Sequence, residues 1–127
     1  MKELTKMQIL ERVRRRFSNP ANRALDSGGT CVYETERGEN CGVGMFLSTP
    51  HRFTGSIEMI QFINGENVQN IDKQFKTEAR GHSIEFWADV QRWHDKASHF
   101  NIKKNCISRS GAARMRRLKS KWNNNYQ

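Results

Sequence analysis

The sequence predicts a single α+β domain that is mostly helical, with a small β-hairpin and a basic amphipathic helix near the C-terminus. A length of 127 residues suits one domain, and a hydrophobic fraction of 35% supplies one modest core. Apolar residues recur at helical spacing near both ends of the chain. We divide the chain into a compact body, residues 1–100, and a basic C-terminal segment, residues 101–127.

The first predicted helix covers residues 6–17. Thr5 is an N-cap candidate, and Gln8 three residues later completes a capping box. Pro20 ends the segment, because a residue before proline disfavours the helical conformation. The apolar face consists of Ile9, Leu10, Val13 and Phe17.

The middle of the chain predicts the hairpin and two short helical segments. Residues 31–35 alternate in polarity, and residues 41–47 are apolar with two glycines, so we expect these two segments to pair as strands. We attribute the glycines to close backbone packing, because the capped helix of a phosphate-binding loop is missing. Residues 57–63 and 68–75 have helical spacing.

Two further helices follow. Ser83 caps an apolar segment that we extend to residue 100, with Ala97 on its buried face. Residues 101–110 are polar and are expected to form a loop. Ser108 or Ser110 then caps a helix of about 111–122. Its apolar stripe is Gly111, Met115, Leu118 and Trp122. The predicted core is Ile9, Val13, Phe17, Phe46, Ile60, Ile71, Phe75, Trp87, Val90 and Trp93.

Charge is distributed unevenly. The chain has 22 Lys and Arg against 13 Asp and Glu, a net charge of +9. Residues 101–127 contain eight basic side chains and no acid, so residues 1–100 are left with a net charge of +1. Residues 1–17 have six basic and two acidic side chains. A nearly neutral body with basic ends indicates a polyanionic partner.

Several protein classes do not fit this composition. No apolar run reaches the roughly 18 residues that span a bilayer, and charged residues interrupt the N-terminal segment where a signal peptide would be apolar. Cys31, Cys41 and Cys106 are an odd number of cysteines, which favours reduced thiols. We therefore expect a cytoplasmic protein without a transmembrane segment.

Short motifs lie in a fixed order along residues 4–100. They are Arg23-Ala24 before Asp26, Cys31-x-Tyr33, Gly38-x-x-Cys41-x-Val43-Gly44 and Val90-Gln91-x-x-His94-Asp95. Together they resemble a family of small uncharacterised proteins of bacteriophages and prophages. The chain departs from the family pattern at residues 46–50, where Leu-Ile-Pro-Asp-Glu is usual, and at Val90, where leucine is common. The resemblance implies a phage accessory protein in the bacterial host cytoplasm, and it supplies no catalytic residues.

Metal and thiol chemistry were weighed against packing roles. Zinc binds cysteine and histidine side chains, and the chain offers Cys31, Cys41, His94 and Cys106 as possible ligands. These residues lack the close ligand pairs that are typical of structural zinc sites. Cys41 with His94 and Asp95 has the residue types of a nucleophile, a base and an orienting group. However, helix neighbours point in different directions, so we expect Asp95 not to orient His94. We favour buried thiols and a core histidine, and we expect no enzyme activity, metal or cofactor.

The basic segment is the candidate functional site. Clustered cations bind nucleic-acid backbones by releasing counterions, and aromatic rings can stack on bases. Arg12, Arg15 and Arg16 would extend the basic patch if the first and last helices packed side by side. The candidate nucleic-acid-binding residues are Lys103, Lys104, Arg109, Arg114, Arg116, Arg117, Lys119, Lys121 and Trp122.

The predicted function is therefore binding of DNA, RNA or a host nucleoprotein complex by a non-enzymatic accessory protein. The alternative is an inhibitor of an acidic host enzyme or anti-phage defence complex, with the apolar face of Met115, Leu118 and Trp122 docked in a groove of that protein. The same face could form a homodimer. A helix on an anionic lipid surface and a merely solvated basic face are the other interpretations of this segment.

Overall fold

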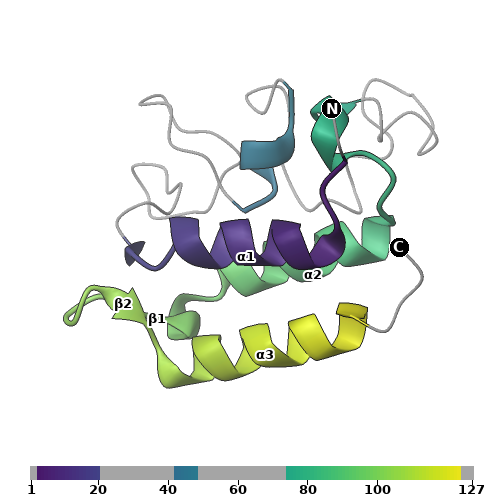
Figure 1. Ribbon diagram of the computed structural model, residues 1–127. Helices are drawn as coiled ribbons and strands as arrows, with labels where there is room; N and C mark the ends of the chain where they lie inside the picture. The colour runs from purple at the N-terminus through teal and green to yellow at the C-terminus, as the bar shows by residue number, and fades with distance from the viewer. Residues whose placement is uncertain (1–2, 21–41, 49–73, 124–127) are drawn as a thin grey trace.

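The computed structural model describes residues 3–20, 42–48 and 74–123. Within these ranges, three α-helices pack against one another: α1 (Lys6–Arg16), α2 (Ile84–Asp95) and α3 (Arg109–Asn123). A two-stranded antiparallel hairpin, β1 (Phe100–Asn101) and β2 (Cys106–Ile107), lies between α2 and α3. Figure 1 shows α1 and α3 side by side, with the hairpin extending beyond their ends. The mostly helical α+β fold class is confirmed.

Helix α1 begins as predicted. The Thr5 hydroxyl accepts a hydrogen bond from the Gln8 backbone N–H at 3.1 Å, and the Gln8 side chain accepts one from the Thr5 N–H at 2.8 Å. This reciprocal pair satisfies two N–H groups that would lack helical partners. Leu4, directly before the cap, is held in place by a hydrogen bond from its backbone N–H to the Glu78 carbonyl at 2.7 Å.

The hairpin that the structure describes is not the one predicted from the middle of the chain. Residues 31–41, the expected first strand and turn, lie outside the described residues. Gly44–Phe46 forms a 3-10 turn instead of a strand, and only Leu47 pairs with Phe75 in an antiparallel bridge. The prediction that residues 68–75 continue as a helix is therefore wrong at Phe75. The prediction of a loop at residues 101–110 is also wrong, because β1, β2 and the start of α3 occupy it.

Helix α2 is shorter than predicted. Ser83 caps it through a hydrogen bond from the Phe86 N–H at 3.2 Å, but the helix ends at Asp95. A 3-10 turn, Ala97–His99, then leads into β1 and leaves Ala97 exposed. The apolar residues keep helical spacing as far as residue 100, although the helix itself ends at Asp95.

The first turn of α3 is held tightly against this 3-10 turn. The Ser108 hydroxyl accepts from the Gly111 N–H at 3.1 Å, so Ser108 caps the helix as one of the two predicted candidates. The Gly111 carbonyl accepts from the indole N–H of Trp93 at 2.9 Å. A Cβ on Gly111 would lie 2.2 Å from the His99 carbonyl oxygen, so only glycine allows this approach.

The core is one cluster that includes α3. Every predicted core residue within the described ranges is buried, whereas Ile60 and Ile71 lie outside those ranges. Trp87 stacks on Phe75 with ring centroids 4.4 Å apart, and Gly42 packs against the side chains of Val90 and His94. The boundary at residue 100 does not divide two bodies, because Met115, Leu118 and Trp122 belong to the same core as α1 and α2.

Candidate nucleic-acid interface

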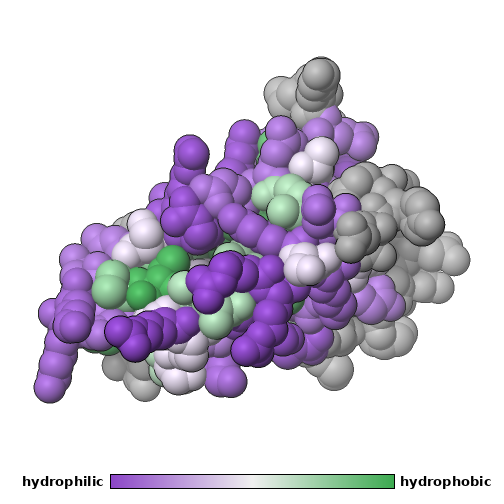
Figure 2. Space-filling view, turned by 60° about the horizontal axis from the view of Figure 1, so that its bottom comes forward, coloured by the Kyte–Doolittle hydropathy of each residue, from purple (hydrophilic) through white to green (hydrophobic). Residues whose placement is uncertain are grey.

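Helix α3 has two chemically different faces. Gly111, Met115, Leu118 and Trp122 are buried, as the predicted stripe requires. The rest of the helix is mostly solvent-accessible and contains no acidic residue. Figure 2 brings this side of the molecule forward and shows mainly hydrophilic side chains. We define the exposed arginines of α3 as the basic ridge: Arg109, Arg114, Arg116 and Arg117.

The hairpin continues this basic surface. Lys103 and Lys104 are exposed in the turn between β1 and β2, and Arg109 is the first residue of α3. Figure 1 shows the hairpin at the N-terminal end of α3. The seven predicted cations with exposed side chains, Lys121 included, therefore lie on consecutive parts of one hairpin–helix unit.

The condition for a contribution from α1 is met, because α1 and α3 pack side by side. Arg12, Arg15 and Arg16 are exposed. At about 100° per residue, Arg15 lies roughly 40° around the helix from Glu11, which contacts α3, whereas Arg12 and Arg16 lie roughly 100° and 140° from it. Arg15 therefore borders the α3 side, and the other two point further from it.

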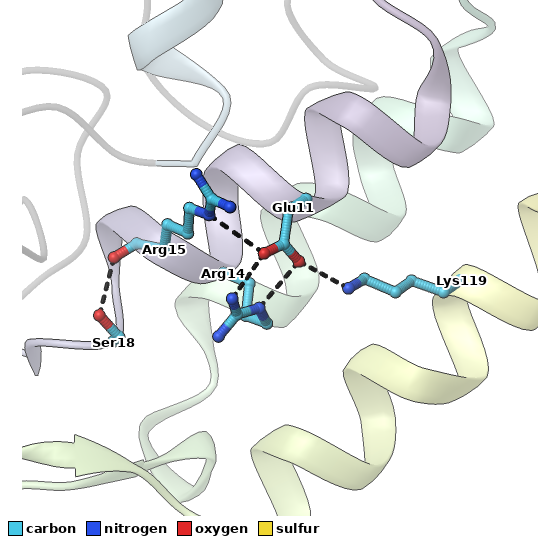
Figure 3. Close-up of polar contacts among 5 residues, drawn as sticks. All are labelled: Glu11, Arg14, Arg15, Ser18 and Lys119. Atoms are coloured by element: carbon cyan, nitrogen blue, oxygen red, sulfur yellow. Dashed lines mark hydrogen bonds and ion pairs between the residues drawn. The ribbon is translucent and has the colours of Figure 1, made fainter.

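Glu11 gathers three cations between α1 and α3 (Figure 3). Arg14 binds it with both Nε (2.9 Å) and Nη2 (2.5 Å), and Arg15 donates from Nε at 3.2 Å. Lys119 of α3 donates from Nζ at 2.7 Å. The Arg14 and Lys119 hydrogen bonds hold the pKa of the Glu11 carboxyl far below its ordinary value. Lys119 is thus engaged in an ion pair. The guanidinium nitrogens of Arg14 and Arg15 that do not contact Glu11 extend the charged surface.

Asp89 of α2 forms the second ionic contact to α3. Its side chain is 4% exposed and accepts hydrogen bonds from Lys121 Nζ at 2.7 Å and Trp122 Nε1 at 3.1 Å. Arg92 donates to its other oxygen at 3.2 Å. Burial acts to raise the pKa of this carboxyl, but the three hydrogen bonds outweigh burial and the pKa is lowered. Lys121 therefore links α3 to α2 through Asp89 and is not a cation without a partner.

The structure does not offer Trp122 for base stacking. The ring is 9% exposed, and it packs edge-on against Phe86 with centroids 5.4 Å apart. We therefore remove Trp122 from the candidate set. The alternative in which Met115, Leu118 and Trp122 dock on another protein, or on a second copy, loses its surface in the same way, because the fold itself covers that face.

His94 is a core residue, as expected, but its neighbour does contact it. Its ring is fully buried against Phe17, and Nδ1 lies 3.0 Å from an Asp95 oxygen. The expectation that Asp95 cannot orient His94 is wrong, because Asp95 is the last residue of α2, where the chain turns away. Cys31 and Cys41 lie outside the described residues, and Cys106 is a half-buried free thiol. Within the described ranges, no three His, Cys, Asp or Glu side chains group as a metal site.

Both anchoring carboxylates, Glu11 and Asp89, are absent from the predicted site. Glu11 is the acid in a run of arginines at spacings of three and four residues, a pattern typical of helical ion pairs. Asp89 lies between Ala88 and Val90 on the apolar side of α2, where an ionised group needs partners. Neither signal identifies the lysine on α3 that completes each contact.

No family model, curated protein or solved structure matches this chain. The resemblance to bacteriophage proteins therefore stays a prediction from the motifs. Within the described residues, no helix has the length and apolar character to cross a membrane.

Proposed function

We propose that this protein is a non-enzymatic phage accessory protein that binds nucleic acid or a nucleoprotein complex. The observation that carries the proposal is the arrangement of α3, whose apolar face is fixed in the core, while Arg109, Arg116 and Arg117 lie on the solvent side of the helix and Arg114 lies on its flank. Because packing in the core already orders the backbone of α3, that backbone loses little further freedom when the cations meet phosphates, and more of the electrostatic attraction appears as affinity.

Surrounding contacts support this function over plain solvation of the helix. Lys119 and Lys121 of α3 form ion pairs with Glu11 and Asp89. The four arginines of the ridge, in contrast, have no acidic residue on α3 with which to pair. Arginine is suited to phosphate because its planar group donates two parallel hydrogen bonds. The proposed contacts are Arg109, Arg114, Arg116 and Arg117, with Lys103 and Lys104 of the hairpin.

Point variants test the proposal better than truncation, because removing α3 would also remove part of the core. We would measure fluorescence anisotropy of a labelled 25-base-pair duplex and of a single strand of the same length, across a salt series. Replacing Arg114, Arg116 and Arg117 together with glutamine should lower duplex affinity by at least tenfold at low salt. It should also reduce the slope of log affinity against log salt by roughly two to three, since each phosphate contact contributes about 0.9.

Lys76 supplies the matched control. It is exposed and lies on the segment that follows the Leu47–Phe75 bridge, outside the hairpin–helix unit. Lys76→Gln and Arg116→Gln each remove one positive charge. If the ridge binds phosphate, only Arg116→Gln weakens binding and flattens the salt dependence. Equal effects of the two variants would mean that net charge alone attracts the probe, and absence of wild-type binding to either probe would reject the proposal.

A further inference from the structure

The turn of the hairpin exposes an apolar side chain among cations. Ile102 is 67% exposed, and among the described residues it is the large hydrophobic side chain that stands out in solvent. Lys103 and Lys104 follow it directly and are also exposed. Figure 1 shows this turn projecting beyond the ends of α1 and α3, so the turn can reach a surface that these two helices do not touch.

The turn is held in shape by its own hydrogen bonds. The Asn105 N–H donates to the Ile102 carbonyl at 3.2 Å, and the Lys104 N–H donates to the Asn101 side chain at 3.0 Å. Asn105 takes the left-handed conformation with φ of 55°, which asparagine tolerates. The turn therefore owes its geometry to Asn101 and Asn105, and the isoleucine side chain has no part in it.

The base of the hairpin is anchored on both sides. Phe100 is buried and packs edge-on against Trp93 with centroids 5.4 Å apart. On the other strand, β2 leads directly into Ser108, which caps α3. The turn is thus attached to the core through Phe100 and to the helix of the basic ridge through Ser108. It is not a loop that stands free of the fold.

An aliphatic tip flanked by lysines matches the way proteins deform duplex DNA. Minor-groove binding proteins insert Leu, Ile, Met, Phe or Pro between base steps while cations contact the bordering phosphates. Single-strand binding instead relies on exposed aromatic rings, and the Phe and Trp rings in the described parts of the chain are buried. The described surface therefore suits a duplex better than a single strand.

We propose that Ile102 is a wedge that enters the minor groove of duplex DNA at a deformable base step and bends the duplex. Lys103 and Lys104 contact the phosphates on either side of that step, and the basic ridge holds the adjoining backbone. Pyrimidine–purine steps such as TA are the expected targets, because they unstack most easily. This inference rests on the proposed nucleic-acid binding and adds the ligand class and the mode of contact.

The test measures binding and bending separately. A 25-base-pair duplex with a central TA step is labelled at both ends, so that energy transfer reports end-to-end distance and anisotropy reports binding. Wild-type protein should bind and raise energy transfer. Ile102→Ser should still bind, within about tenfold of wild type or about 1.4 kcal/mol, and should leave energy transfer at the value of free DNA. Ile102→Leu keeps an aliphatic tip and should restore the bend.

Each outcome decides between the two proposals. If wild-type protein binds neither duplex nor single strand, the proposed function fails and the wedge fails with it. If it binds duplex without bending it, or Ile102→Ser bends it as well as wild type, the wedge is overturned while the basic ridge stands. If Ile102→Ser leaves duplex behaviour unchanged but abolishes binding to vesicles containing 30% phosphatidylserine, the tip serves a membrane surface and the wedge is again overturned. Because Ile102 is exposed, all three proteins should unfold at the same urea concentration.

Discussion

Asp89 and Glu11 each accept a hydrogen bond from a lysine of α3 at 2.7 Å, but they do so in different surroundings. The Asp89 side chain is 4% exposed and also holds the indole N–H of Trp122. The Glu11 side chain is 33% exposed, and its other partners are surface arginines of its own helix. The two lysine contacts are therefore equal in length but unequal in their contribution to stability. Water compensates for a broken contact at Glu11, whereas it is excluded at Asp89.

This difference separates two tasks along the same helix. The contact with α2 fixes α3 in the fold, since it combines a buried carboxylate with buried apolar side chains. The contact with α1 lies at the surface, where phosphate groups of a ligand can compete for the same arginines. Ion pairs of α3 are therefore expected to matter for stability on one side and for binding on the other.

The largest expected effect comes from removing the ring that the Asp89 contact orients. Trp122→Ala should lower the free energy of unfolding by about 3–5 kcal/mol, the usual range for a buried aromatic residue. Arg116→Ala, on the opposite face of the same helix, should change it by less than about 0.5 kcal/mol. Urea denaturation followed by circular dichroism measures both values. Similar losses for the two variants would contradict the two-faced description of α3.

The two carboxylates can be compared directly. Asp89→Ala should cost about 1–3 kcal/mol, because the Trp122 N–H is left without a partner in a buried site. Glu11→Ala should cost less than about 1 kcal/mol, the range of exposed ion pairs. The same urea experiment applies, and a larger loss for Glu11→Ala than for Asp89→Ala would reverse our ranking.

Acid should weaken the fold through both groups. Their pKa values are lowered in the folded protein, so the unfolded chain binds more protons as the pH falls. The stabilisation is fully present above the ordinary carboxyl pKa of about 4 and is lost progressively below it. Unfolding free energies at pH 7, 5, 4 and 3 should decline less steeply in Asp89→Asn than in wild type. An identical decline in the two proteins would show that Asp89 is not a source of the acid sensitivity.

The smallest expected effect concerns binding. Glu11→Gln releases Arg14, Arg15 and Lys119 from their shared carboxylate and raises the net charge by one. Duplex affinity at low salt should increase by about two- to fivefold, and the gain should disappear at high salt, where exposed charges are screened. Asp89→Asn serves as the comparison, because its cations hold α3 in place. A loss of affinity in Glu11→Gln would mean that the carboxylate positions the arginines for binding instead of competing with phosphate.

Much of the helical fold could be read from the sequence. The capping box at Thr5, the cap at Ser83 and the apolar stripes of α1 and α3 are local patterns, and each appears where it was predicted. The predicted strand over residues 41–47 was wrong at Gly44–Phe46. The β1–β2 hairpin was not predicted, since its strands contain two residues each and are too short to produce a recognisable alternation. The basic residues can be listed from the sequence, but their division into exposed and ion-paired members depends on distant partners.

Local sequence patterns are sufficient to predict the beginnings of α1 and α2, the core residues within the described ranges and the excess of positive charge near the C-terminus, because these follow from composition and from neighbours three or four positions apart. Tertiary structure alone decided that Trp122 is buried, that Lys119 and Lys121 pair with Glu11 and Asp89, and that Ile102 projects beside two lysines. Those outcomes require contacts between residues separated by 32 and 108 positions, or the geometry of a turn held by Asn101 and Asn105. No local periodicity in the sequence predicts such contacts, since they form only when the helices pack.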